Sequence, residues 1–201
     1  MISDLAIIIY GALKENLIKS RSDFWKNFAE IKTLQNLPID IQKYRKELSE
    51  KGFDVICSYD NDFPKIDCAV KNSESPFLFV YKGDISLLKN INNNVAVIGV
   101  LNPTQNIIDR EKEFVKVLVN NKQNIVSGLA SGCDTIAHKT CLECGGKTVA
   151  FLPTTLDNIY PKQNSDLVNG ILENGGLVIT EYVGEPKNKY ENILNNQCFY
   201  F

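Results

Sequence analysis

The sequence lacks long apolar segments. Its longest apolar runs, such as Leu5–Tyr10 and Val149–Leu152, fall well short of the roughly 20 residues that a membrane-spanning helix needs. Its first residues, Met-Ile-Ser-Asp, also lack the basic segment that opens a secretory signal peptide. We therefore expect a cytoplasmic protein that has no membrane partner.

Metal-binding and catalytic side chains are also scarce. The 201 residues include one histidine, His138, and six scattered cysteines, which we expect to be reduced thiols. Cys141 and Cys144 form a Cys-x-x-Cys pair, but zinc would need two further ligands at comparable spacing. A redox pair would be expected at a helix N-terminus, and this pair follows a predicted helix. With no second imidazole and no evident nucleophile, the sequence indicates no metal site, no catalytic residue and no enzyme activity.

An excess of basic residues is missing as well. Lysine and arginine number 22 against 24 aspartates and glutamates, which gives a net charge of −2 and a pI near 5.5. A strong nucleic-acid binder usually carries a clear basic excess, so binding would depend on a local basic patch. Hydrophobic residues make up 44% of the chain, enough for one sizeable core with a small additional subdomain.

Residues 1–52 and 53–201 differ in pattern, and we expect them to form separate regions. The first region has helical spacing of apolar residues, with predicted helices over about 4–20, 22–31 and 38–52. The second region begins with short apolar runs that are typical of strands. We therefore expect a small helical N-terminal region followed by a larger domain.

Strands and helices alternate after residue 94. The predicted strands are Val95–Ile98, Asn124–Ser127, Lys147–Leu152 and Leu177–Thr180, with amphipathic helices between them. This order predicts an α/β fold with a Rossmann-like, doubly wound, mostly parallel sheet and helices on both faces. In such sheets, ligands bind at the carboxyl ends of the strands.

A glycine-containing turn, Ser127-Gly-Leu-Ala-Ser-Gly132, connects the second of these strands to the next helix. Backbone N–H groups at a helix N-terminus favour anions, so the turn is a candidate phosphate site. The alternative is that its serines only cap the helix and its glycines only relieve a tight turn. Gly99, Thr154 and Glu181 follow the other three strands, and this convergence favours the phosphate site.

Four segments together resemble the DNA-processing protein A family (DprA, also called Smf). They are Val95-Ala-Val-Ile-Gly99, Val126-Ser-Gly-Leu-Ala-Ser-Gly-Cys-Asp-Thr-Ile-Ala-His138, Leu156-Asp-Asn-Ile-Tyr-Pro-Lys-Gln-Asn164 and Gly175-Gly-Leu-Val-Ile-Thr-Glu-Tyr182. The second segment departs from the family's fixed positions only at Cys133. The resemblance covers roughly residues 50–201, in the family's order and spacing.

The resemblance implies a dimeric protein that binds single-stranded DNA and passes it to the RecA recombinase during DNA uptake or recombination, with no cofactor. Carried over by position, the phosphate- or nucleic-acid-binding residues would be Gly99, Ser127, Gly128, Ala130, Ser131, Gly132, Asp134, Thr154, Lys162, Asn164 and Glu181. Backbone N–H groups of the turn would hold phosphate oxygens, and Lys162 would supply a positive charge. We expect Asp134 and His138 to be helix-capping and structural residues.

The chain departs from the family pattern at three places. Val100-Leu101 replaces a Ser-Arg pair, Pro153-Thr-Thr155 replaces Gly-Thr-Gly, and Ile193–Phe201 has no arginine where the family has two. Each lost phosphate contact predicts weaker and less salt-dependent DNA binding. The chain also stops before the family's C-terminal part.

Two other functions fit a Rossmann-like fold. A sensor of nucleotides or nucleotide-derived signals would use the turn for one phosphate. A phosphoribohydrolase-like enzyme would need a Pro-Gly-Gly-x-Gly-Thr loop followed by a catalytic glutamate, and neither Gly145-Gly146 nor Gly175-Gly176 lies in that pattern. The enzyme is the weaker of these alternatives.

Overall fold

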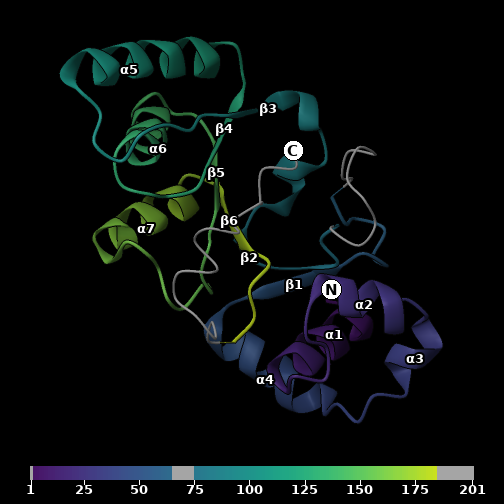
Figure 1. Ribbon diagram of the computed structural model, residues 1–201. Helices are drawn as coiled ribbons and strands as arrows, with labels where there is room; N and C mark the ends of the chain where they lie inside the picture. The colour runs from purple at the N-terminus through teal and green to yellow at the C-terminus, as the bar shows by residue number, and fades with distance from the viewer. Residues whose placement is uncertain (1, 65–74, 185–201) are drawn as a thin grey trace.

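Six strands form one sheet in the order β1-β2-β6-β5-β4-β3 (Figure 1). The computed structural model describes residues 2–64 and 75–184, so the predictions for Cys68, Cys198 and Ile193–Phe201 lie outside the described residues. The strands are β1 (Asp54–Cys57), β2 (Leu78–Gly83), β3 (Asn94–Ala96), β4 (Asn124–Ser127), β5 (Thr148–Phe151) and β6 (Leu177–Thr180). Strands β3 to β6 are parallel, whereas β2 is antiparallel to both β6 and β1. The predicted α/β fold with a mostly parallel sheet is confirmed.

Three helices connect the parallel strands: α5 (Gln105–Asn120), α6 (Cys133–Glu143) and α7 (Ser165–Glu173). The chain crosses the sheet in one direction, from β3 to β6, and right-handed crossovers then place every connecting helix on the same face. Strand residues on that face, such as Ile125, Ala150 and Val178, contact these helices. Helices on both faces were expected. In the described part of the chain, the opposite face is instead covered by the short 3₁₀ helix η2 (Ile85–Leu88) and by Phe63.

The N-terminal region forms four helices, α1 (Asp4–Lys14), α2 (Arg21–Asn27), α3 (Ile31–Gln35) and α4 (Ile41–Lys51). Helix α1 starts where the Ser3 hydroxyl accepts a hydrogen bond from the Ala6 N–H, and α4 ends at Gly52, whose φ of 62° suits glycine. The predicted first helix was too long, since α1 stops at Lys14. The predicted second helix is divided into α2 and α3.

These four helices pack on β1 and β2. Val55 and Val80 point into their hydrophobic cluster, while Ile56 and Phe79 point to the opposite face of the sheet. Val80 lies opposite Thr180, on the same face as Val178, so both groups of helices cover one face. One hydrophobic cluster contains residues of these helices and of β1 and β2. The predicted boundary between residues 52 and 53 stays a prediction.

Strand β3 is shorter than predicted. The Val97 N–H still donates to the Val126 carbonyl (2.9 Å), but the chain then crosses the N-terminus of α6, where the Cys133 N–H donates to the Val100 carbonyl (3.1 Å). The sheet therefore ends early at this edge, and Gly99 lies in an exposed loop. In residues 2–64 and 75–184, no helix has both the length and the apolarity to cross a membrane.

Candidate nucleic-acid interface

The predicted site residues follow the carboxyl ends of β3 to β6, and the structure separates them into two groups. One group surrounds the glycine turn between β4 and α6. The other lines a cleft next to β5 and β6. The groups are joined by the segment that precedes α7.

Asp134 occupies the inside of the glycine turn. Its Oδ2 accepts hydrogen bonds from the Gly128 N–H (3.1 Å) and the Ala130 N–H (3.3 Å). Burial raises the pKa of Asp134, while these hydrogen bonds act to lower it. The buried Ser127 hydroxyl donates to the Val97 carbonyl (2.7 Å). Several groups that the sequence assigned to a phosphate thus have partners within the protein.

The backbone of Val100 and Leu101 passes so close to residue 132 that only glycine fits there. The φ of Gly132 is 81°, and an added Cβ would lie 2.3 Å from the Val100 carbonyl oxygen. This glycine therefore lets the loop after β3 close on α6. Among the described residues, no acceptor is found for the N–H groups of Ser131 and Gly132, so their predicted role in holding an anion stays a prediction.

Asn164 fastens the next loop to the turn. Its Nδ2 donates to the Leu129 carbonyl and to the Thr135 hydroxyl, both at 2.8 Å, and Gln163 Nε2 donates to the Ser131 hydroxyl (3.1 Å). Asn164 is only 4% exposed, so its place is that of a positioning residue. Lys162 directly precedes Gln163 and Asn164, which hold its backbone beside the turn, and its side chain is exposed. No carboxylate of the described residues forms an ion pair with it.

His138 is fully buried beneath the turn. Its Nδ1 lies 2.7 Å from the Thr148 hydroxyl, which itself donates to the Ile125 carbonyl (2.8 Å). Nδ1 must therefore carry the proton. Burial lowers the pKa of His138 to about 3 and keeps the ring neutral. Residues 2–64 and 75–184 contain no group of three or more potential metal ligands, and their four cysteines are free thiols.

Glu181 follows β6, but its side chain is buried and does not line the cleft. Its side chain is 8% exposed and forms a 2.7 Å ion pair with Arg21 of α2. This contact joins the end of β6 to the helical region. Sequence reasoning missed it because nothing in a local pattern connects residues so far apart.

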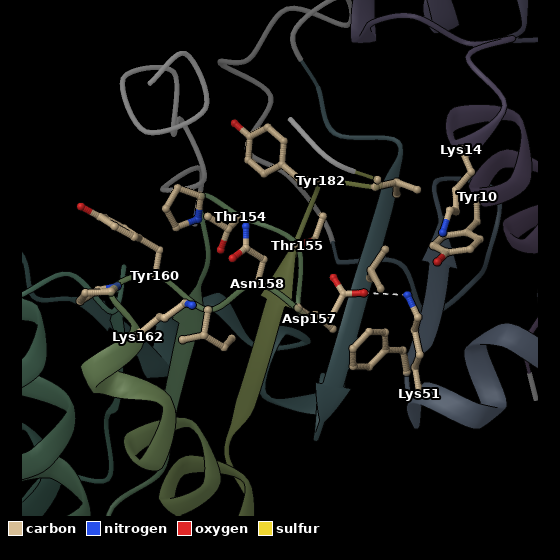
Figure 2. A pocket seen from close by; sticks show the side chains of 18 of the residues that line it. Tyr10, Lys14, Lys51, Thr154, Thr155, Asp157, Asn158, Tyr160, Lys162 and Tyr182 are labelled. Carbon is tan, nitrogen blue, oxygen red and sulfur yellow. Dashed lines mark hydrogen bonds and ion pairs between the residues drawn. The ribbon is translucent and has the colours of Figure 1, made fainter. Parts of the chain in front are cut away.

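The cleft has a volume of about 1270 Å³ and lies between the two groups of helices. Figure 2 shows Lys162 and Tyr160 on one side, Tyr10, Lys14 and Lys51 on the other, and Thr154, Thr155 and Asn158 between them. Of the predicted site residues, Thr154 and Lys162 line this cleft. Lys14, Lys51, Asn158 and Tyr160 were not predicted, because single lysines and aromatics in the sequence give no signal of a shared surface.

Ion pairs organise the wall formed by α1 and α4. Lys51 Nζ lies 2.6 Å from Asp157 and 3.3 Å from Glu47, while Lys14 Nζ lies 2.7 Å from Glu47. The Tyr10 hydroxyl also donates to Glu47 (3.1 Å). The Asp157 carboxylate thereby connects the loop after β5 to α4.

Comparisons with known proteins identify the family of the chain. The family model of DNA recombination-mediator protein A matches residues 54–197. Protein Smf of Borreliella burgdorferi is 38% identical over 122 residues, which is 59% of this chain and 37% of that protein. DNA processing protein DprA of Streptococcus pneumoniae is 41% identical over 125 residues, 62% of this chain and 43% of that protein.

Two solved structures are similar. The X-ray structure of DprA from S. pneumoniae gives a TM-score of 0.63 at 30% identity and covers 94% of this chain and 66% of that one. A structure of DNA processing protein A from Helicobacter pylori, which concerns that protein's single-stranded DNA binding mode, gives 0.58 at 28% identity, with 71% and 61% covered. The chain spans less than half of these curated relatives. It belongs to the DNA recombination-mediator protein A (DprA/Smf) family.

Proposed function

We propose that the chain binds single-stranded DNA at the cleft and acts in DNA uptake and recombination in the cytoplasm. The observation that carries this proposal is the exposed Lys162, held by Asn164 and Gln163 between the glycine turn and the cleft. A phosphate there would meet the ammonium group of Lys162 and the N–H groups of Ser131 and Gly132. Such contacts bind the backbone without reading the base sequence.

The size of the cleft favours a polymer over a single nucleotide. Its volume of about 1270 Å³ exceeds the roughly 300–1,000 Å³ typical of small-molecule pockets. Tyr160, 45% exposed at its rim, offers a ring on which a base could stack, and stacking of this kind tolerates any base. These features support the DNA-binding proposal over the nucleotide sensor.

The same contacts support binding without catalysis. His138 is buried and neutral, and Glu181 is paired with Arg21, so neither is placed to transfer a proton to a ligand. Among the described residues, the cleft is lined by no cysteine, histidine or serine. Transfer of DNA to RecA remains the role that family resemblance implies.

We also propose a homodimer. Ile98, Val100, Leu101, Phe114 and Val117 are each more than half exposed, on the loop after β3 and on α5. Exposed large apolar side chains of this kind are common at surfaces where protein chains associate. Light scattering should give twice the chain mass for the wild type and a monomer for Phe114→Glu, and a monomeric wild type would contradict the dimer.

Fluorescence polarisation with labelled oligothymidylate at two salt concentrations tests DNA binding. We expect salt-sensitive binding, and Lys162→Ala should weaken it and lower the salt slope by about one, because one phosphate contact is lost. Lys46→Ala, on an exposed position of α4, is the matched control and should bind as the wild type does. Absence of salt-sensitive binding at micromolar wild-type protein would contradict the proposed function.

A further inference from the structure

The far wall of the cleft comes from outside the segment that defines the family. The family model begins at residue 54, whereas Lys14 lies on α1, Lys51 ends α4, and Phe53 follows α4. All three line the same cleft as Lys162 (Figure 2). The helical region therefore brings two lysines to a surface whose other side the family motif supplies.

The charges of this wall are balanced by carboxylates. Lys14 and Lys51 pair with Glu47 and Asp157, so the wall is neutral as it stands. The Lys51–Asp157 pair is open to solvent, with side chains 33% and 49% exposed. Solvent-exposed ion pairs add little stability, so a phosphate can replace Asp157 as the partner of Lys51 with little loss.

The surface between the two walls suits an extended strand. Tyr160 stands beside Lys162, and Thr155 and Asn158 lie between these residues and Lys51 (Figure 2). Asn158 is exposed and offers both a donor and an acceptor to a base edge. A backbone that passes Lys162 can continue over this floor to the lysines of α1 and α4.

We propose that α1 and α4 form a second binding wall for single-stranded nucleic acid, in which Lys51 exchanges Asp157 for a backbone phosphate. The inference rests on the proposed function, because it extends the strand that Lys162 would bind. Lys14, whose one ion-pair partner among the described residues is Glu47, lies farther along the same wall. The helical region thus determines how long a strand the protein can hold.

Two variants that remove the same ion pair test this proposal. Lys51→Ala removes the cation that would meet phosphate, so it should weaken binding of an oligothymidylate of about 16 nucleotides by about threefold or more and lower the salt slope by about one. Asp157→Asn releases Lys51 from its carboxylate, so it should strengthen binding. If the ion pair served only to hold the structure, both variants would weaken binding alike, and that result would overturn the proposal.

Strand length and a neighbouring lysine provide the controls. A dinucleotide, whose one internucleotide phosphate cannot contact Lys162 and Lys51 on opposite sides of the cleft at once, should bind wild type and Lys51→Ala equally. Lys46→Ala, on the same helix and paired only with Glu50 at 3.8 Å among the described residues, should bind as the wild type does. Thermal melting of each variant shows that it is folded.

The outcomes separate this inference from the proposed function. If Lys162→Ala weakens binding while Lys51→Ala and Lys14→Ala bind the long oligomer as the wild type does, the second wall is wrong and the proposed function stands. If the wild type binds neither oligomer, both are wrong.

Discussion

At the scale of single residues, Asp134 determines which N–H groups of the glycine turn already have a partner within the protein. Its carboxylate accepts hydrogen bonds from two backbone N–H groups, which are then no longer available to a bound anion. The sequence pattern was correct that a turn connects β4 to the next helix, while its phosphate-binding role stays a prediction. The pattern could not show that a side chain four to six residues away already accepts these hydrogen bonds, because this depends on the side-chain conformation of a buried aspartate.

His138 should make stability depend on pH. Burial holds its pKa near 3 in the folded protein, below the unfolded value of about 6.5, so the unfolded chain takes up the proton first as the pH falls. Well above pH 6.5, His138 is neutral in both states and the free energy of unfolding does not depend on it. For each pH unit below 6.5, His138 should lower the free energy of unfolding by about 1.4 kcal/mol. Urea unfolding at pH 7 and pH 5 measures this loss.

His138→Gln is the comparison for that measurement. Its free energy of unfolding should fall by about 2 kcal/mol less than that of the wild type between pH 7 and pH 5, whatever the other groups contribute. An equal fall in the two proteins would show that His138 does not titrate as described.

Gly132 and Gly145 allow conformational strain to be separated from crowding. Both have a φ in the left-handed region, but a Cβ at Gly132 would meet the Val100 carbonyl at 2.3 Å, whereas one at Gly145 would have nothing within 4 Å. Gly145→Ala should cost about 1 kcal/mol, and Gly132→Ala about 3 kcal/mol or more. Equal losses in urea unfolding would contradict the crowding.

At the scale of elements, the strands were predictable and their long-range contacts were not. Apolar runs such as Asn124–Ser127 and Leu177–Thr180 are β4 and β6 within the predicted bounds, because buried parallel strands are apolar throughout. The cleft is also lined by the ion pair of Lys51 and Asp157, which are 106 positions apart. No local pattern contains such a pair, so this half of the cleft was absent from the prediction.

The Arg21–Glu181 contact should stabilise the junction of α2 with β6. Arg21→Ala leaves a carboxylate that is 8% exposed without this partner, and we expect a loss of about 1–3 kcal/mol in the free energy of unfolding. Arg45→Ala removes an ion pair with Asp4 in which the Asp4 side chain is 68% exposed, and it should cost less than about 1 kcal/mol. Similar losses would argue that the burial of Glu181 has no energetic consequence.

At the scale of the whole molecule, the cleft results from the order of the strands. Because the parallel strands advance in one direction, α5, α6 and α7 share a face of the sheet with α1 and α4, and space remains between the two groups. The mostly parallel fold was predictable from the alternation of strands and helices. The shared face was not, because the sequence does not reveal the direction in which the chain crosses the sheet.

The core shared by the helices and β1–β2 has a practical consequence for anyone who expresses part of this protein. A fragment that begins at residue 54, where the family match begins, would uncover Val55, Cys57, Leu78 and Val80 to water. We expect that fragment to accumulate in inclusion bodies, whereas the full chain is recovered from the supernatant after centrifugation. A fragment recovered in the supernatant with its sheet intact by circular dichroism would show that the first 53 residues are dispensable for folding.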